Sequence, residues 1–218
     1  MLPQRRAARL VYARPSMDRD TRQALEAELR RRFDAGDLDG AMTAAVQGYG
    51  SELLGFLVGL TRDHDRASDI LGAACERMWR GLPSFRWDSS FRVWAYAITR
   101  NEMLRTAPKV ARDRAGVPVS QVASMHLALD QVRSATARFQ QTEVKDELSR
   151  LREQLDPEDH ALVTLRLDRR LAWNDIARVL AADTPPANLA REAAALRKRF
   201  ERLKERLAGQ LAADQTEE

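Results

Sequence analysis

Cysteine is nearly absent from this chain, since Cys75 is the only one among its 218 residues. A single thiol excludes a disulfide framework and a thiolate metal site, and it fits a reducing cytoplasm. Long apolar runs are missing too. The longest, residues 53–60, is interrupted by two glycines and is shorter than the roughly 20 residues that cross a bilayer. We therefore expect a cytoplasmic protein without membrane insertion.

Signals for β-strands and for catalysis are equally scarce. The sequence has no sustained alternation of β-branched residues, and only 10 Gly and 8 Pro interrupt its many Ala, Leu, Arg and Glu residues. His64, His126 and His160 are scattered, and there is neither a Gly-rich phosphate loop nor a Gly-x-Ser-x-Gly motif. The chain is therefore predicted to be all-α, and to be neither an enzyme nor a binder of metals or cofactors.

Apolar periodicity predicts two small helical domains joined by a flexible linker. Helical spacing is clear up to residue 106 and again from 144, whereas Pro108, Gly116 and Pro118 interrupt the stretch between. The predicted organisation is a basic arm at 1–19, a helical domain at 20–106, a linker with room for one short helix at 107–140, a second helical domain at 141–209 and an acidic tail at 210–218. The arm is either disordered or lies upstream of a true start at Met17.

Capping residues mark the expected helix starts. Residues 37–61 are predicted to form one long helix or two, and Asp65 is expected to cap the helix that follows. Ser89 or Ser90 is expected to cap the next helix, which ends near residue 106. Asp156 followed by Pro157 is typical of a helix start, because proline suits the first helical position.

Aromatic and basic residues concentrate in residues 85–101, which read FRWDSSFRVWAYAITRN. Helical spacing predicts that Phe91, Trp94, Ala95 and Ile98 face inward. Arg92, Tyr96, Thr99 and Arg100 then fall on other faces of the same helix.

Positive charge is unevenly distributed along the chain. The net charge is only +4, yet residues 191–206 hold seven cations against three glutamates. Trp173 and Ile176 lie on a short helix before this basic helix, which is the order of a helix-turn-helix. Two interpretations remain open, a phosphate-binding surface and an ordinary solvated helix face.

These segments together resemble the sigma-70 family of bacterial transcription initiation factors, in its small extracytoplasmic-function (ECF) group. Residues 65–85, DRASDILGAACERMWRGLPSF, follow the family's pattern, and residues 85–101 carry its F-x-x-x-S-S-F-x-x-W-x-Y-x-I-x-R-N signature in full. NDIARVL and LRKRFERLKERL, residues 174–180 and 196–207, follow the rhythm of its last two helices. The resemblance covers about residues 38–106 and 141–208.

The resemblance implies that the first domain (region 2) binds core RNA polymerase and opens the promoter −10 element, and that the second (region 4) reads the −35 element. The −10 DNA contacts that it implies are Trp87, Asp88, Ser89, Ser90, Arg92, Arg100, Asn101 and Arg105. The implied −35 contacts are Arg191, Arg197, Lys198, Arg199 and Arg202. The implied polymerase contacts are Asp69, Glu76, Arg77 and Arg80.

A physical reason supports the −10 assignment, because unstacked bases need aromatic or polar pockets beside a cationic track for phosphates. The competing interpretation is that Phe91, Trp94 and Ile98 are simply core residues.

Two departures from the family pattern stand out. Gly72-Ala73 replaces the frequent Gln-Glu, and the turn before the last helix is long, so that either Thr184 or Asn188 caps that helix.

The sequence therefore predicts a sigma factor whose partners are bacterial core RNA polymerase and promoter DNA. Members of this group are often held by an anti-sigma factor, which makes such a protein a candidate partner. The alternative is a helix-turn-helix transcriptional regulator that does not bind core polymerase, which would have no need for the signature at 85–101.

Overall fold

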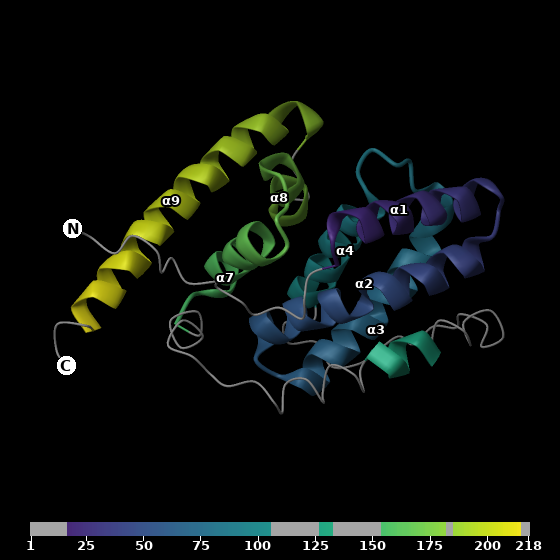
Figure 1. Cartoon of the computed structure of the whole chain (residues 1–218), viewed down its shortest axis with the longest axis horizontal. Coiled ribbons are helices and arrows are strands. Elements are labelled where there is room, and N and C mark those ends of the chain that lie inside the picture. Colours follow the sequence, from purple (N-terminus) through teal and green to yellow (C-terminus); the bar gives the residue numbers. More distant parts are fainter. Residues whose placement is uncertain (1–16, 106–126, 133–153, 182–184, 215–218) are drawn as a thin grey trace.

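The computed structural model describes residues 17–105, 127–132, 154–181 and 185–214, and the regular structure in these ranges is helical throughout. The N-terminal half comprises α1 (Arg19–Asp34), α2 (Leu38–Thr61), α3 (His64–Gly81), the 3-10 turn η1 (Leu82–Ser84) and α4 (Phe91–Arg105). The C-terminal half comprises α7 (Pro157–Val163), the π-helical turn η2 (Thr164–Asp168), α8 (Trp173–Leu180), the 3-10 turn η3 (Pro186–Asn188) and α9 (Leu189–Asp214). The two halves lie side by side, with α9 along the outer edge (Figure 1). The all-α prediction is confirmed.

Helix α2 is the centre of the N-terminal half and contacts α1, α3, α4 and α7. It is a single helix, which settles whether residues 37–61 form one or two. The Asp37 carboxylate caps its start by accepting a hydrogen bond from the Gly40 N–H at 2.9 Å. Met42, Leu54 and Leu57 are fully buried along it. This apolar surface is what α1, α3 and α4 cover.

The start of α3 corrects one predicted cap. Asp63, with an extended backbone, accepts a hydrogen bond from the Arg66 N–H at 3.0 Å and is the capping residue. The expectation that Asp65 caps this helix was wrong. Asp65 already lies inside the first turn, where its negative charge complements the positive end of the helix dipole.

Helix α4 is buried on two sides. Phe91 and Ala95 pack inward as predicted, and Trp94 and Ile98 are partly buried against the core. Tyr96 and Thr99, expected on other faces, are fully buried as well. The Tyr96 ring meets Phe56 of α2 edge-on and its hydroxyl bonds Glu52 of α2, while α8 also packs against α4. A helix between two layers loses the exposed face that its single apolar stripe predicts.

The C-terminal half begins with a capped helix, and an aromatic contact joins its last two helices. The Asp156 carboxylate accepts a hydrogen bond from the Asp159 N–H at 2.8 Å, with Pro157 at the first helical position. The start of α9 at Leu189, directly after Asn188, follows the shorter of the two predicted helices. Thr184 lies outside the described residues. The ring of Trp173 on α8 meets that of Phe200 on α9 edge-on, with centroids 5.6 Å apart.

Part of the predicted linker packs on the N-terminal half. Residues 127–132 are helical, and Ala128, Leu129 and Val132 are buried in the shared core. Val132 lies so close to Gly50 on α2 that an added Cβ there would come within 2.9 Å of its side chain. The rest of the predicted linker, residues 1–16 of the predicted basic arm at 1–19, and residues 144–153 at the start of the second helical domain lie outside the described residues.

Two buried tyrosines join α2 and α4 to acidic partners. The Tyr49 hydroxyl donates to Glu26 on α1 and the Tyr96 hydroxyl donates to Glu52 on α2, each at 2.8 Å. Burial, which disfavours the charged phenolate, raises the pKa of both tyrosines well above the ordinary value near 10. Both therefore remain neutral hydrogen-bond donors while the chain is folded.

The raised pKa values predict that stability falls at high pH. In the unfolded chain both phenols ionise near pH 10, whereas in the folded chain they keep their protons, so the free energy of unfolding decreases as the pH rises above about 10. The measurement is ultraviolet titration of a Tyr12→Phe variant, which leaves Tyr49 and Tyr96 as the only tyrosines. We expect phenolate absorbance to rise only together with loss of helical circular dichroism. Ionisation near pH 10 with the helices intact would contradict the burial argument.

Candidate nucleic-acid interface

The loop at residues 85–90 is held by a cluster of aromatic rings. Phe85 stacks on Trp94 with centroids 4.6 Å apart, and it also contacts Trp87 at 4.8 Å. Trp87 in turn meets Phe33 of α1 edge-on at 5.6 Å. Its backbone φ is 60°, in the left-handed region that a bulky residue rarely adopts. Such a conformation costs about 1–3 kcal/mol and persists only where surrounding contacts enforce it, as this cluster does.

Glu26 on α1 fixes the first turn of α4. Its carboxylate accepts hydrogen bonds from the N–H groups of Phe91 at 2.9 Å and Arg92 at 3.0 Å, in addition to the Tyr49 hydroxyl. Ser90 contributes a weaker cap, accepting from the Val93 N–H at 3.3 Å. Sequence reasoning found the serine but missed Glu26. No local signal marks it, because it lies 65 residues before Phe91.

The polar side chains of the loop point to solvent at the N-terminal end of α4. Asp88 and Ser90 are exposed, and Ser89 is partly so. Arg86, which the sequence prediction did not include, is 83% exposed and forms an ion pair with Asp88 at 2.8 Å. Arg30 of α1 lies over the Trp87 ring, 5.1 Å from its centroid. The loop therefore combines a rigid aromatic base with exposed charges of both signs.

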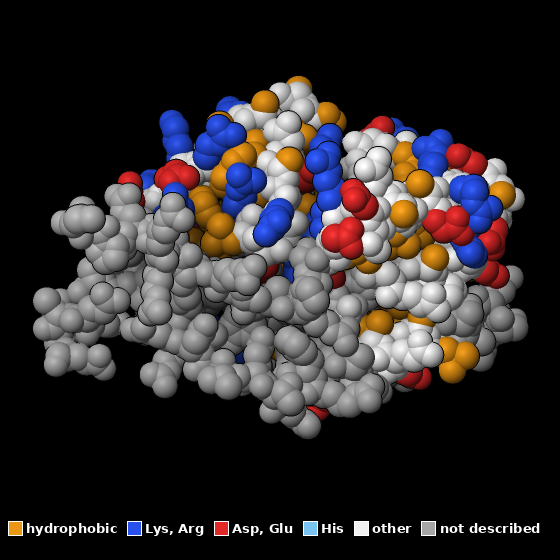
Figure 2. Space-filling view, viewed as in Figure 1, with side chains coloured by type: hydrophobic (Ala, Val, Ile, Leu, Met, Phe, Trp, Pro, Cys, Tyr) orange, Lys and Arg blue, Asp and Glu red, His pale blue; other side chains and the backbone are white. Residues whose placement is uncertain are grey.

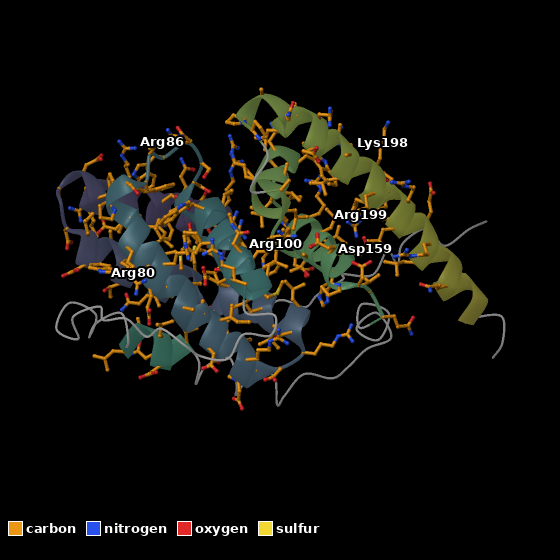
Figure 3. All side chains as sticks on the ribbon, turned by 180° about the vertical axis from the view of Figure 1, so that it is seen from behind. Arg80, Arg86, Arg100, Asp159, Lys198 and Arg199 are labelled. Atoms are coloured by element: carbon orange, nitrogen blue, oxygen red, sulfur yellow. The ribbon has the colours of Figure 1, made fainter. Side chains whose placement is uncertain are left out.

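The predicted contacts on α4 itself divide into two groups. Arg105 is exposed and Asn101 is partly buried. Arg92 and Arg100 are 3% and 7% exposed and lie between the two halves. Arg100 forms an ion pair with Glu158 of α7, and Figure 3 shows it between α4 and the C-terminal helices. The two arginines are thus on the covered side of α4, not on the solvent side that the helical pattern suggested.

A buried charged cluster surrounds Arg92. The Glu52 carboxylate on α2 accepts hydrogen bonds from Arg92, with the Nε 2.7 Å away, and from the Tyr96 hydroxyl. Arg92 also donates to the Arg169 carbonyl at 3.1 Å, and the Arg169 guanidinium donates to the Glu52 carbonyl at 3.3 Å. We refer to Glu52, Arg92, Tyr96 and Arg169 as the Glu52 cluster. It joins α2 and α4 to the segment between η2 and α8.

Helix α9 presents a cationic face to solvent. Arg191, Arg197, Lys198 and Arg202 are all exposed. Figure 2 shows basic side chains gathered over the C-terminal helices, whereas basic and acidic side chains alternate over α1. Arg197 also lies over the Trp173 ring, 5.6 Å from its centroid.

Arg199 differs from its predicted partners in the −35 set. Its Nε bonds Asp159 of α7 at 2.7 Å, and Arg206 bonds the other oxygen of the same carboxylate at 2.8 Å. Figure 3 shows Arg199 turned toward Asp159, with Lys198 pointing away from it. Arg199 therefore seats α9 on α7, and the exposed cations around it remain available for a ligand.

The predicted polymerase contacts share the outer face of α3. Asp69, Arg77 and Arg80 are exposed, and Glu76 is partly so. Arg80 pairs with Glu76 at 3.5 Å, and Arg77 pairs with Glu102 of α4. Gly72 and Ala73 lie along the same face, one turn from Asp69 and Glu76, and are partly exposed. The face therefore combines charges of both signs with two small residues between them.

No helix among the described residues combines the length and apolarity needed to span a membrane. No group of three His, Cys, Asp or Glu side chains among them is arranged to hold a metal ion.

Comparisons with known proteins agree with the geometry of the N-terminal half. Residues 45–112 match the family model of sigma-70 region 2, a match that takes in most of α2 and all of α3 and α4. The matched segment contains the predicted −10 and polymerase-contact residues. The comparisons thus support the class of sigma-70 family sigma factors.

The chain is also similar to a curated bacterial protein. Over 165 residues the chain is 28% identical to the RNA polymerase sigma-H factor of Pseudomonas aeruginosa, an alignment that covers 72% of this chain and 83% of that protein. No solved structure matches significantly. The two matches together support a sigma factor role in transcription initiation.

The cap that Glu26 places on α4 yields a stability prediction. Glu26→Ala removes the acceptor of two N–H groups and of the Tyr49 hydroxyl, so the free energy of unfolding should fall by about 1–2 kcal/mol. Denaturant titration measures the change. Glu28→Ala is the matched control on the same helix, because its bonds to Arg31 and Arg32 are at the surface and the loss should stay below about 1 kcal/mol. Equal losses in the two variants would show that Glu26 does not cap α4.

Proposed function

We propose that this protein is an ECF-type sigma factor that binds bacterial core RNA polymerase, recognises a promoter and opens its −10 element, with no chemistry of its own. One observation carries the proposal. The segment that matches sigma-70 region 2 contains a loop with a rigid aromatic base and exposed polar residues. This loop directly precedes α4, a helix rich in arginine.

The loop at 85–90 suits the capture of an unstacked base. The ring of Trp87 is partly buried, and the part left accessible is an aromatic surface on which a base could stack. Asp88, Ser89 and Ser90 offer hydrogen-bonding groups beside it. Single strands are bound by such aromatic surfaces together with cations that follow the phosphates. Arg105 supplies one exposed cation, and Arg86 and Arg30 add two that the sequence prediction did not include. We assign the −10 contact to this surface, with Asn101, Arg92 and Arg100 further along α4.

Helix α9 suits contact with duplex DNA at the −35 element. It is seated on α7 and α8 through Phe200, Leu203 and Arg199, and it presents Arg191, Arg197, Lys198 and Arg202 outward. A helix held in this way after a shorter helix is the geometry with which helix-turn-helix proteins enter the major groove. Arg199 then supports the helix, and its neighbours contact phosphates and base edges.

The outer face of α3 is the proposed polymerase surface, with Asp69, Glu76, Arg77 and Arg80 as contacts. An anti-sigma factor is a further candidate partner, and the cytoplasm is the compartment where polymerase and promoter are found.

The second candidate function is a DNA-binding regulator that uses only α8 and α9. The exposed cations of α9 support it, but it assigns no role to the loop at 85–90.

Run-off transcription tests the proposal. The purified chain is added to core polymerase from the same source with a promoter library, and transcripts are sequenced. A loop variant, Asp88→Ala/Arg105→Ala, is expected to lose transcripts at least about tenfold on duplex templates while core binding persists, since each lost contact weakens DNA binding by about 1–3 kcal/mol. A template with a pre-melted −10 region should restore part of the signal. Arg31→Ala, which removes an exposed cation on α1, is the control.

Two further variants separate the other surfaces. Lys198→Ala/Arg202→Ala should weaken binding to duplex DNA evenly across sequences and reduce the slope of log affinity against log salt by about two, about one per phosphate contact. Asp69→Ala/Arg80→Ala should abolish core binding and leave DNA binding intact. A wild-type chain that retains duplex DNA but neither binds core nor yields transcripts would overturn the sigma factor proposal in favour of the regulator.

A further inference from the structure

Two arginines of the C-terminal half are held by one aromatic ring. The Arg166 guanidinium lies over the Trp173 ring with its Cζ 4.7 Å from the centroid, and the Arg197 guanidinium lies over the same ring at 5.6 Å. Arg166 also donates to the Leu171 carbonyl at 3.0 Å. Neither arginine has a carboxylate partner in the described part of the chain. Trp173, the first residue of α8, thus holds one cation from η2 and one from α9.

An aromatic ring holds a cation differently from a carboxylate. Arg199, two residues beyond Arg197, has its charge balanced by Asp159 of α7, and Arg178 on α8 pairs with Asp175 at 3.2 Å. A ring is uncharged, so its attraction for a guanidinium restricts the side chain and leaves the full positive charge available to an anion or a base edge. A cation fixed in this way loses less freedom on binding than one on an unrestrained side chain.

The place of Arg197 on α9 explains why the ring reaches it. Arg197 and Phe200 are three residues apart, so they occupy neighbouring positions on one side of the helix. Phe200 is buried and meets Trp173 edge-on, whereas Arg197 is exposed. Lys198, the next residue, is also exposed and lies over no ring among the described residues. Trp173 therefore connects the packed side of α9 to one outward cation and not to its neighbour.

We propose that Trp173 is a positioning residue for Arg197, and that it makes Arg197 the cation of α9 that discriminates between base pairs. A guanidinium held in one orientation binds the O6 and N7 acceptors of guanine through two parallel hydrogen bonds, and a mobile cation does so less selectively. Lys198 and the other outward cations remain phosphate contacts. The inference rests on the proposed contact of α9 with duplex DNA, which the sigma factor and the regulator have in common.

A purely structural role is the alternative for Trp173, because its ring also packs on Phe200. The two roles predict different results. Loss of packing loosens α9 as a whole, which weakens the phosphate contacts with the rest and lowers the salt dependence of DNA binding. Loss of positioning keeps every charge in place, so the salt dependence persists and only the discrimination between duplexes falls.

The test compares two duplexes. The wild-type chain first selects its preferred sequence from a random duplex library, and a shuffled duplex of the same composition serves as the non-specific site. Fluorescence anisotropy then measures both affinities over a range of salt for the wild type, Trp173→Leu, Arg197→Ala and the double variant. Trp173→Leu is expected to lower the ratio of the two affinities by about two- to fivefold, the strength of a guanidinium–indole contact, and to leave the salt slope unchanged.

The double variant separates the two roles. In the Arg197→Ala background, Trp173→Leu is expected to have no further effect on the ratio, because the residue that it positions is gone. In the Lys198→Ala background, which is the matched control, the loss of about two- to fivefold should persist. Circular dichroism verifies that the helices remain. Trp173→Phe, which keeps a smaller ring, should give an intermediate ratio, and it replaces Trp173→Leu in both backgrounds if that variant does not fold.

Failure of this inference can be distinguished from failure of the proposed function. An equal loss in the Arg197→Ala background, or a lower salt slope in Trp173→Leu, would show that Trp173 only packs α9 and would overturn the inference even if the wild type yields transcripts. A wild-type chain that selects no duplex would also overturn it, since run-off transcription tests the sigma factor proposal separately. A loss confined to chains with Arg197, in a protein that yields no transcripts with core polymerase, would uphold the inference and overturn the sigma factor proposal.

Discussion

The Glu52 carboxylate is the interaction on which the arrangement of the two halves depends. It lies at the middle of the central helix α2 and gathers Arg92, Tyr96 and Arg169 around one buried negative charge. Two guanidiniums then share one carboxylate, and Asp168, also buried, is the next acidic residue that acts on Arg169. Removing Glu52 would leave the buried Arg92 without its carboxylate partner, which is far more damaging than removing a neutral contact. Glu52 therefore anchors the contact between the two halves, which the Arg100–Glu158 ion pair and the packing of α8 on α4 complete.

A second acid, Glu26, has a comparable role at the start of α4. It ties α1 to the first turn of α4 and to Tyr49, and it does so beside the strained Trp87 backbone. The loop at 85–90 is therefore held at both ends, by the stack of Phe85 on Trp94 and by the cap on Phe91. A loop held in this way does not have to be ordered when a ligand arrives, which removes part of the entropic cost of binding.

The local features of this fold could be predicted from the sequence, and the long-range polar contacts could not. The helix start at Asp156, the cap from Ser90 and the inward positions of Phe91 and Ala95 depend on neighbours within one or two helical turns. The cap from Glu26 and the bond from Arg169 to Glu52 join residues 65 and 117 positions apart. Arg92 illustrates the difference, because an arginine beside an apolar stripe looks exposed until a second layer of helices is known to cover it. Arg199 and Lys198 are adjacent cations that sequence alone cannot separate into a support and a free charge.

The pair of bonds from Asp159 to Arg199 and Arg206 sets the rotation of α9 about its own axis. These arginines lie seven residues apart, two turns along one side of the helix, so the carboxylate is held at two points and α9 cannot turn or slide on α7. Phe200 and Leu203 fill the same side. Of the outward positions, 191, 198 and 202 take no part in this seat, whereas Arg197 also lies over the Trp173 ring of α8. The residues that hold the helix and those that would read a ligand are thus separable, and new binding preferences could be grafted onto the outward positions without rebuilding the domain beneath them.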